Sequence, residues 1–131
     1  MAETASAPTP KLGSTVFEWA KLAVKPTATG ERRDIVDAPT ATMKNFECHV
    51  TTLNPGEAPH EAHRHPDEEL IIVKEGVLEV RINDRTQQAG PGSMLFFASN
   101  DLHGLRNAGT TRATYYVLRV LTSDTPKASG Q

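Results

Sequence analysis

The sequence predicts an all-β protein with one folded domain. Short runs of β-branched and aromatic residues recur along the chain, turn-forming residues separate them, and no long stretch has the periodicity of a helix. The chain has 131 residues and a formal net charge of −2. A chain of this size can bury most of its apolar surface without disulfide or metal crosslinks. These features are typical of a β-sandwich or a β-barrel.

The segment before the domain is expected to form a tail and an arm. Residues 1–14 are rich in Ala, Ser, Thr and Pro, which is typical of disordered tails. The next segment has partial helical spacing, but Pro26 ends the pattern. We therefore expect a short or irregular arm that packs Phe17 or Trp19 against another surface. Together with a short edge strand, this arm is assigned to residues 15–42.

Alternation between apolar and polar side chains indicates the first strand of the domain. Phe46, Cys48 and Val50 alternate with polar neighbours, so they are expected to face the core. His49 would then face away from the core, and we interpret it as a surface or supporting residue and not as a metal ligand. Cys48 is the only cysteine, which excludes an internal disulfide and a cysteine-based zinc site. It is expected to be a buried thiol.

A hairpin is predicted in the middle of the chain. Residues 70–73 and 78–82 form two β-branched runs joined through Gly76, which can adopt the positive φ of a tight connection. Residues 70–73 are apolar on both faces, so the outer face needs a cover that a second subunit would supply. We therefore expect a homodimer.

The remaining strands follow at regular spacing. A turn that starts at Asn83 leads to a polar strand, and apolar strands are expected over 94–97 and 114–121. The domain is assigned to residues 43–121. Residues 122–131 return to the composition of a disordered tail.

The strongest functional signal is a group of histidines with one carboxylate. His63 and His65 are two residues apart, Glu69 follows, and His103 comes later in the chain. On a strand, side chains two residues apart point to the same side, so one extended segment can offer two imidazoles to one ion. Imidazole suits zinc, iron, copper and nickel, and an added carboxylate leaves several metals possible. The alternative is a solvated loop of exposed histidines.

These residues also resemble the two motifs of the cupin family. The first motif is similar to the set Gly56, His63, His65, Glu69 and Gly76, with one extra residue between Gly56 and His63. The second motif is similar to the set Gly92, His103 and Asn107. In this second set, Ala98 stands where the family usually has Pro, and Asn100 stands where it usually has Gly. The resemblance covers residues 43–121.

The resemblance implies both an architecture and a site. The architecture is a double-stranded β-helix, or jelly-roll, cupin barrel with an N-terminal arm that often covers the barrel or the partner subunit. The implied site binds a divalent transition metal, which could be iron, manganese, nickel, copper or zinc. Its implied ligands, which point into the barrel mouth, are His63, His65, Glu69 and His103.

Other residues are assigned to the surroundings of this site. Candidates for accepting hydrogen bonds from metal-bound histidines are Asn107, Gln87 and Gln88. His60 could line the entrance or pair with substrate, but the interpretation as an exposed loop residue is favoured. The pocket walls could include Met94, Phe96, Phe97, Tyr115 and Tyr116, with ordinary core packing as the alternative for each.

Three classes of function fit such a barrel. The first is a metal-dependent enzyme that acts on a small organic molecule, either a dioxygenase or a non-redox isomerase, lyase or hydrolase. The second is a non-catalytic module that binds a small molecule, and the third is a metal-free structural barrel. Nucleic acid is not an expected partner because the chain has no basic footprint.

A membrane-bound protein is not expected either. No stretch of the sequence approaches the roughly 20 apolar residues that span a bilayer. The N-terminus lacks the basic and apolar regions of a signal peptide. We therefore expect a cytoplasmic protein, or an exported one if a leader has been removed.

Overall fold

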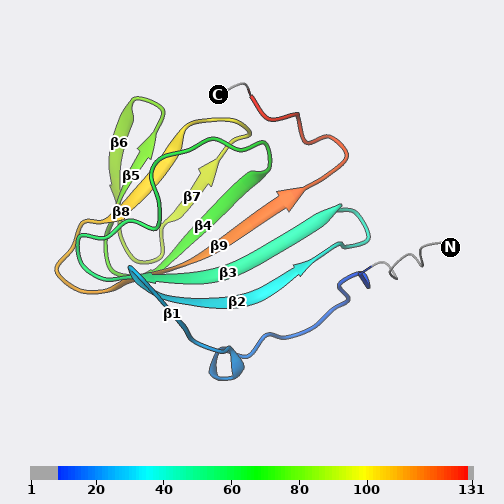
Figure 1. Cartoon of the computed structure of the whole chain (residues 1–131), viewed down its shortest axis with the longest axis horizontal. Helices are drawn as coiled ribbons and strands as arrows, with labels where there is room; N and C mark the ends of the chain where they lie inside the picture. Colours follow the sequence, from blue (N-terminus) through cyan, green and yellow to red (C-terminus); the bar gives the residue numbers. More distant parts are fainter. Residues whose placement is uncertain (1–8, 130–131) are drawn as a thin grey trace, which may run out of the picture.

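The computed structural model of the protein describes residues 9–129 and confirms the predicted all-β jelly roll. Nine strands and one short 3₁₀ turn, η1 (Trp19–Lys21), form within these residues (Figure 1). The strands are β1 (Lys25–Thr27), β2 (Gly30–Ala38), β3 (Asn45–Leu53), β4 (Glu68–Glu75), β5 (Leu78–Ile82), β6 (Arg85–Ala89), β7 (Met94–Phe97), β8 (His103–Asn107) and β9 (Ala113–Leu121). Among residues 9–129, no helix has the length and apolar character needed to cross a membrane.

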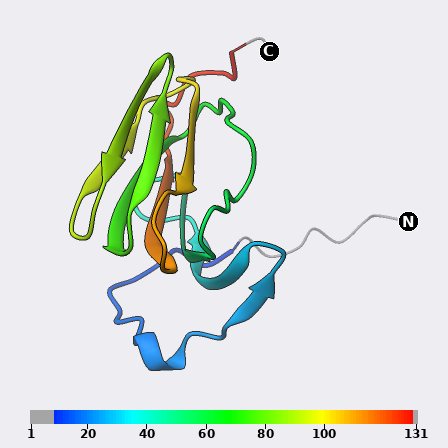
Figure 2. The same cartoon turned by 90° about the vertical axis from the view of Figure 1, so that its left-hand side faces the viewer.

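The strands form two antiparallel sheets that face each other, as Figure 2 shows from the side of the small sheet. The large sheet has the order β1-β2-β3-β9-β4-β7, and the small sheet has the order β6-β5-β8. The core lies between them and draws side chains from both sheets. Its largest fully buried apolar members are Leu53, Ile71, Val73, Leu78, Phe97 and Tyr115. Burial of these side chains holds the two sheets together.

The predicted hairpin through Gly76 does not form, because β4 and β5 belong to different sheets. β4 pairs with β7 and β9, whereas β5 pairs with β6 and β8. The apolar runs and the glycine are the same for a hairpin and for a corner between two layers, so the local pattern could not separate the two. The structure uses the glycine, at φ 84°, to turn the chain from one sheet to the other. The turn expected at Asn83 is confirmed, with φ 53°.

The alternation predicted in β3 is right, but Phe46, Cys48 and Val50, which were expected in the core between the sheets, lie on the outer face of the large sheet. Thr51 pairs with Tyr115 and His49 pairs with Val117, and both partners belong to the core between the sheets. His49 therefore faces the interior. Alternation shows which residues share a face, but it does not show which face is covered.

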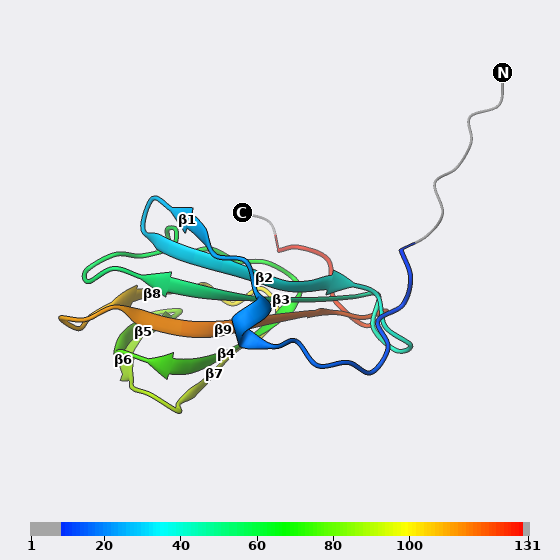
Figure 3. The same ribbon diagram turned by 90° about the horizontal axis from the view of Figure 1, so that it is seen from below.

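The N-terminal arm crosses the outer face of the large sheet, as seen from below in Figure 3. Trp19 contacts Tyr116 with ring centroids 6.2 Å apart, and the Arg33 guanidinium lies 4.5 Å from its ring centre. Tyr116 and Arg33 are the β9 and β2 partners of Val50, which is buried on this face. The packing of Trp19 predicted from the sequence is therefore confirmed, and it explains why both faces of β3 are buried.

The proposed division into tails, arm and barrel remains a prediction. The tail assigned to residues 1–14 lies outside the described residues over 1–8, and the tail assigned to 122–131 lies outside them at 130 and 131. The described part of the second tail contacts the barrel. The side-chain amide of Asn100 donates to the Lys127 carbonyl at 2.9 Å and accepts from the Ser129 amide at 3.1 Å.

Replacing Gly76 with alanine should destabilise the barrel by about 3 kcal/mol or more. A left-handed backbone costs a non-glycine residue about 1–2 kcal/mol, and overpacking adds a similar amount. The added Cβ would lie 2.6 Å from the Ala113 Cα. Gly92→Ala is the matched control, because Gly92 has the same φ of 84° but nothing within 4 Å of the added Cβ. Urea unfolding should show a loss of only about 1–2 kcal/mol for the control. Equal losses would contradict the role of close packing at this corner.

Candidate metal centre

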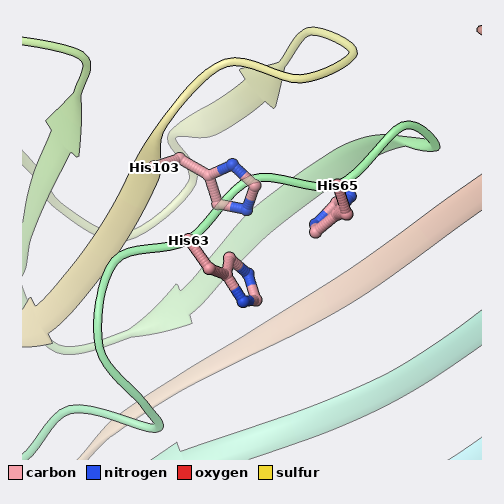
Figure 4. Close-up of side chains that lie close together, drawn as sticks. All are labelled: His63, His65 and His103. Atoms are coloured by element: carbon pink, nitrogen blue, oxygen red, sulfur yellow. The ribbon is translucent and has the colours of Figure 1, made fainter. Parts of the chain in front are cut away.

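Three histidines from two separate segments converge between the sheets. His63 and His65 lie on the segment that connects β3 to β4, and His103 begins β8. The His63 amide donates to the His103 carbonyl at 2.9 Å, and the His103 amide donates to the His63 carbonyl at 3.0 Å. Figure 4 shows the three rings pointing toward one another. One nitrogen from each ring lies within 4.8 Å of those of the other two.

The His63–His65 segment is extended but pairs with a strand at one residue only. His63 forms an isolated bridge to His103, and His65 lies three residues before β4 begins. The turn that precedes His103 secures the second residue, because the Asn100 amide donates to the His65 carbonyl at 2.8 Å. Asn100 has φ 63°, and asparagine tolerates this left-handed backbone better than most residues. Asparagine can therefore stand where the cupin motif usually has glycine.

Glu69 joins this cluster from β4. Its carboxylate oxygen Oε1 lies 2.9 Å from Nε2 of His65 and 3.6 Å from Nε2 of His103. The longer separation is not a hydrogen bond, and Nε2 of His103 is buried without a partner among residues 9–129. A buried nitrogen without a hydrogen bond is costly unless something else binds its lone pair. The four predicted ligands therefore lie close together, and one of their nitrogens, Nε2 of His103, is buried without a hydrogen bond among residues 9–129.

Backbone carbonyls orient two of the rings. Nδ1 of His65 lies 2.8 Å from the Asp67 carbonyl, and Nδ1 of His103 lies 3.1 Å from the Asp101 carbonyl. When Nδ1 donates to these carbonyls, Nε2 is left to face the cluster. The prediction that Asn107, Gln87 or Gln88 accepts these bonds is wrong.

Asn107 has a structural role instead. Its amide nitrogen donates to the Leu53 and Thr111 carbonyls, and its oxygen accepts from the Gly109 amide at 2.9 Å. The oxygen is therefore used within the turn after β8. Gln87 and Gln88 are exposed on β6 and do not line the cavity described below.

The cluster holds one charged carboxylate beside histidines that differ in basicity. Burial and the neighbouring histidines lower the pKa of His63 to about 4. The hydrogen bond to Glu69 raises the pKa of His65. Burial disfavours the charged form of Glu69, but the nearby His103 and His65 rings outweigh it and lower the pKa of Glu69 to about 2. At neutral pH, the site therefore combines an anion with an uncharged imidazole at His63, which is suitable for a cation.

A pair of charged residues holds the histidine segment against the large sheet. Nε and Nη2 of Arg119 on β9 donate to the two Asp67 carboxylate oxygens at 2.7 Å and 2.8 Å. Burial disfavours the charged form of Asp67, but the bidentate bond from Arg119 outweighs it and lowers the pKa of Asp67. The same bond raises the pKa of Arg119. The sequence did not reveal this pair, because Asp67 and Arg119 are 52 residues apart and only the pairing of β4 with β9 brings them together.

A cavity of about 310 Å³ opens beside the cluster. Its lining includes His63, Glu69 and His103, together with threonines of the β1–β3 region and the apolar side chains of Ile71, Leu105 and Val117. His60 also lines it and stacks on His63 at 4.1 Å between ring centroids.

The residues predicted as pocket walls divide between the two faces of the large sheet. Phe97 and Tyr115 line the cavity, and Phe97 stacks on the His103 ring at 4.2 Å. Met94 and Phe96 are exposed on the outer face, and Tyr116 packs on Trp19. His49, which was expected to face away, also lines the cavity.

Comparison with known proteins identifies the family. The cupin domain family profile matches residues 49–119, which is more than half of the chain. The chain belongs to the cupin family. No curated protein sequence gives a significant match to this cupin.

Solved structures share its fold at low sequence identity. An RmlC-like cupin from Shewanella frigidimarina is 14% identical with a TM-score of 0.67, and the match covers 85% of this chain and 95% of that one. KdgF from Halomonas sp. is 13% identical with a TM-score of 0.69, and the match covers 87% of this chain and 100% of that one. The polyketide cyclase RemF from Streptomyces resistomycificus is 18% identical with a TM-score of 0.66, and the match covers 92% of this chain and 87% of that one. At these identities the likeness establishes the fold only.

In metal-free protein, Glu69→Gln should lower stability by about 1–2 kcal/mol, and the loss should depend on pH. The folded-state pKa of Glu69 is depressed from 4.5, so its contribution is present above about pH 4.5 and is lost as pH falls toward 2. The pKa of His65 is raised above 6.5, so its contribution is present below about pH 6.5 and is lost as pH rises through the raised value. Urea unfolding with a chelator present should therefore show the largest difference between about pH 4.5 and 6.5. A difference that does not vary with pH would contradict the ionic pairing.

Proposed function

We propose that this cupin is a metal-dependent enzyme that acts on a small organic molecule. The observation that carries the proposal is the convergence of His63, His65 and His103 beside the Glu69 carboxylate, with the buried Nε2 of His103 left without a hydrogen bond. Three imidazole nitrogens and one carboxylate suit a first-row transition metal such as iron, manganese, nickel, copper or zinc. The cavity beside them has the size of a small-molecule site.

The proposed ligands are His63, His65, Glu69 and His103. A bound divalent metal would supply Lewis acidity or, for a redox-active ion, oxygen chemistry. The protein supplies the charge of Glu69 and the ring orientations set by the Asp67 and Asp101 carbonyls. Phe97 stacks on His103 and covers that ring with an apolar surface, which keeps water from it.

The reaction is either oxidative or non-redox. A dioxygenase needs a metal that exchanges electrons, whereas an isomerase, lyase or hydrolase can use a redox-silent ion. The structural relatives include a polyketide cyclase, but at 18% identity that activity belongs to the relative alone. The identity of the native metal is therefore the observation that separates the two reaction types.

Untagged protein purified without added metal should contain close to one transition metal per chain, and His65→Ala should lose most of it. Loss of an outer partner of a ligand already weakens metal binding about 10–100-fold, and loss of a ligand should weaken it further. Elemental analysis by plasma mass spectrometry measures this, with His63→Ala as a second test. His60→Ala is the control, because His60 stacks on His63 but is exposed and lies outside the three-histidine group.

The result also directs the search for activity. Iron, copper, manganese or nickel that is lost in the variants would lead to an oxygen-uptake screen. Zinc alone would lead to lyase, isomerase and hydrolase assays without oxygen. Unchanged metal content in His65→Ala, or no metal in wild type even after reconstitution, would contradict the proposed site.

We further propose that the enzyme is a homodimer joined through the outer face of the large sheet near β7. Ile72, Met94 and Phe96 are 41%, 65% and 49% exposed there, and β4–β7 pairing places them side by side. The arm packs through Trp19 on Tyr116, the β4–β9 partner of Ile72, so this apolar patch continues a face that is already used for packing. A second copy brings the same apolar surface and would cover the patch.

Phe96→Glu should shift the protein from dimer to monomer, because a charge at the centre of an apolar interface has no partner. Sedimentation equilibrium measures the change, and we expect at least a tenfold weaker self-association. Gln87→Glu on β6 is the control, because it adds the same charge to an exposed strand of the other sheet. A monomeric wild type would refute this interface.

A further inference from the structure

A histidine and a carboxylate on the inner face of β3 form a second group of titratable side chains, separate from the candidate metal centre. His49 and Glu47 are two residues apart, so both side chains leave the strand on the same side. His49 lines the cavity that also contains His63, Glu69 and His103. We propose that His49, held by Glu47, is a proton-transfer residue that faces the candidate metal centre and acts on a small carbonyl compound bound between them. This inference rests on the proposed metal site.

The first support is the geometry of the pair. Nδ1 of His49 lies 2.7 Å from Oε2 of Glu47, and the His49 side chain is only 13% exposed. A carboxylate can only accept this bond, so Nδ1 carries the proton. Nε2 of a neutral ring then has a free lone pair, and it makes no hydrogen bond within the described part of the chain. The ring is thus fixed at one nitrogen and available at the other.

The second support is the position of the pair relative to the metal ligands. Arg119 on β9 pairs with Glu47 on one side and with Glu69 on the other, so both carboxylates lie in one row across the sheet. Two strand spacings, about 10 Å, separate their backbones. In the next inward-facing row, His49 and Ile71 both pair with Val117. A molecule with a few carbon atoms can therefore contact the metal centre at one end and His49 at the other.

The third support is that other charged groups nearby already have partners. The Arg119 guanidinium donates to both oxygens of Asp67 and makes no hydrogen bond to Glu47 among residues 9–129, although the Glu47 charge also helps to raise the pKa of Arg119. Nη2 of Arg32 lies 3.7 Å from Oε2 of Glu47, and its Nε is bonded to Asp34. Glu47 therefore keeps its hydrogen bond with His49 and fixes the orientation of the ring.

These features define the reaction step. Nε2 of His49 takes a proton from the carbon next to the substrate carbonyl, so the C–H bond breaks and an N–H bond forms. The electron pair of the C–H bond forms the C=C bond of an enolate, whose negative charge moves to the carbonyl oxygen. Return of the proton to the same or a neighbouring carbon completes an exchange or an isomerisation, and no oxidant or reductant is consumed. The substrate class is therefore a small enolisable carbonyl compound.

The alternative is that Glu47 and His49 are an ion pair that only stabilises the rim of the barrel. The two readings differ in whether Nε2 carries a proton, because an ion pair requires both ring nitrogens to be protonated, and in the effect of replacing His49. Histidine ¹⁵N spectra of metal-free wild type above pH 8 report the first difference. We expect the Nδ1–H form of His49, and the Glu47→Ala variant should lose this preference. An Nε2–H form in wild type would overturn the proposal, because Nε2 could not accept a proton.

The second measurement follows deuterium exchange from D₂O into the carbon-bound hydrogens of hydroxyacetone and pyruvate by metal-reconstituted protein. His49→Gln should contain as much metal as wild type and should exchange about 100-fold more slowly, since a positioned base contributes about 10²–10⁴-fold. Gln88→Ala is the control, because Gln88 is exposed on β6 and does not line the cavity, and its rate should stay within about twofold of wild type. Glu47→Gln should be intermediate.

The outcomes separate the two proposals. Absence of metal from wild type and from His49→Gln alike would contradict the metal site itself. Equal metal content with equal exchange rates in wild type and His49→Gln would overturn the role of His49 and leave the metal site standing. No exchange by metal-loaded wild type with either probe would also overturn the proton-transfer role.

Discussion

The site depends on two backbone hydrogen bonds between His63 and His103. Their reciprocal amide and carbonyl contacts attach the long β3–β4 connection to the edge of the small sheet. This bridge places two histidines from one segment beside a third that is 38 to 40 positions further along the chain. Without it, the connection would have no sheet partner at the histidines. The side chains converge because the backbones are paired, as the close ring contacts in Figure 4 indicate.

The charged and polar groups around the site are arranged in pairs. Arg119 binds Asp67, and the Asp67 carbonyl in turn orients His65. Glu69 remains the anion closest to the histidines. Burying a carboxylate is costly unless it is paired, and here neighbouring imidazoles offset that cost. The unsatisfied nitrogen of His103 is the exception to this pairing, and exceptions of this kind are frequent where a ligand binds.

The large sheet has a different role on each face. Its inner face carries Glu69, the Glu47–His49 pair and part of the core. Its outer face is covered by Trp19 over one part and exposes Ile72, Met94 and Phe96 over another. Both faces are therefore rich in apolar residues, which is why strands such as β4 lack a simple alternation of apolar and polar side chains.

Local sequence determined the strands, several turns and the ligand candidates. β-Branched runs, the left-handed Asn83 and the spacing of His63, His65, Glu69 and His103 are properties of short segments, and short segments predict them well. Motif order also led to the family, which the profile match to residues 49–119 confirms. Whether these four residues bind a metal remains a proposal.

Only the tertiary structure decided which layer and which face each strand occupies. Gly76 joins two sheets instead of two paired strands, because the partners of β4 and β5 come from elsewhere in the chain. His49 faces the cavity because the arm covers the opposite face of β3, and the pattern of alternation is the same for both orientations. Arg119 reaches Asp67 from a strand 52 residues away. Contacts between distant segments set these features, so no local pattern in the sequence could reveal them.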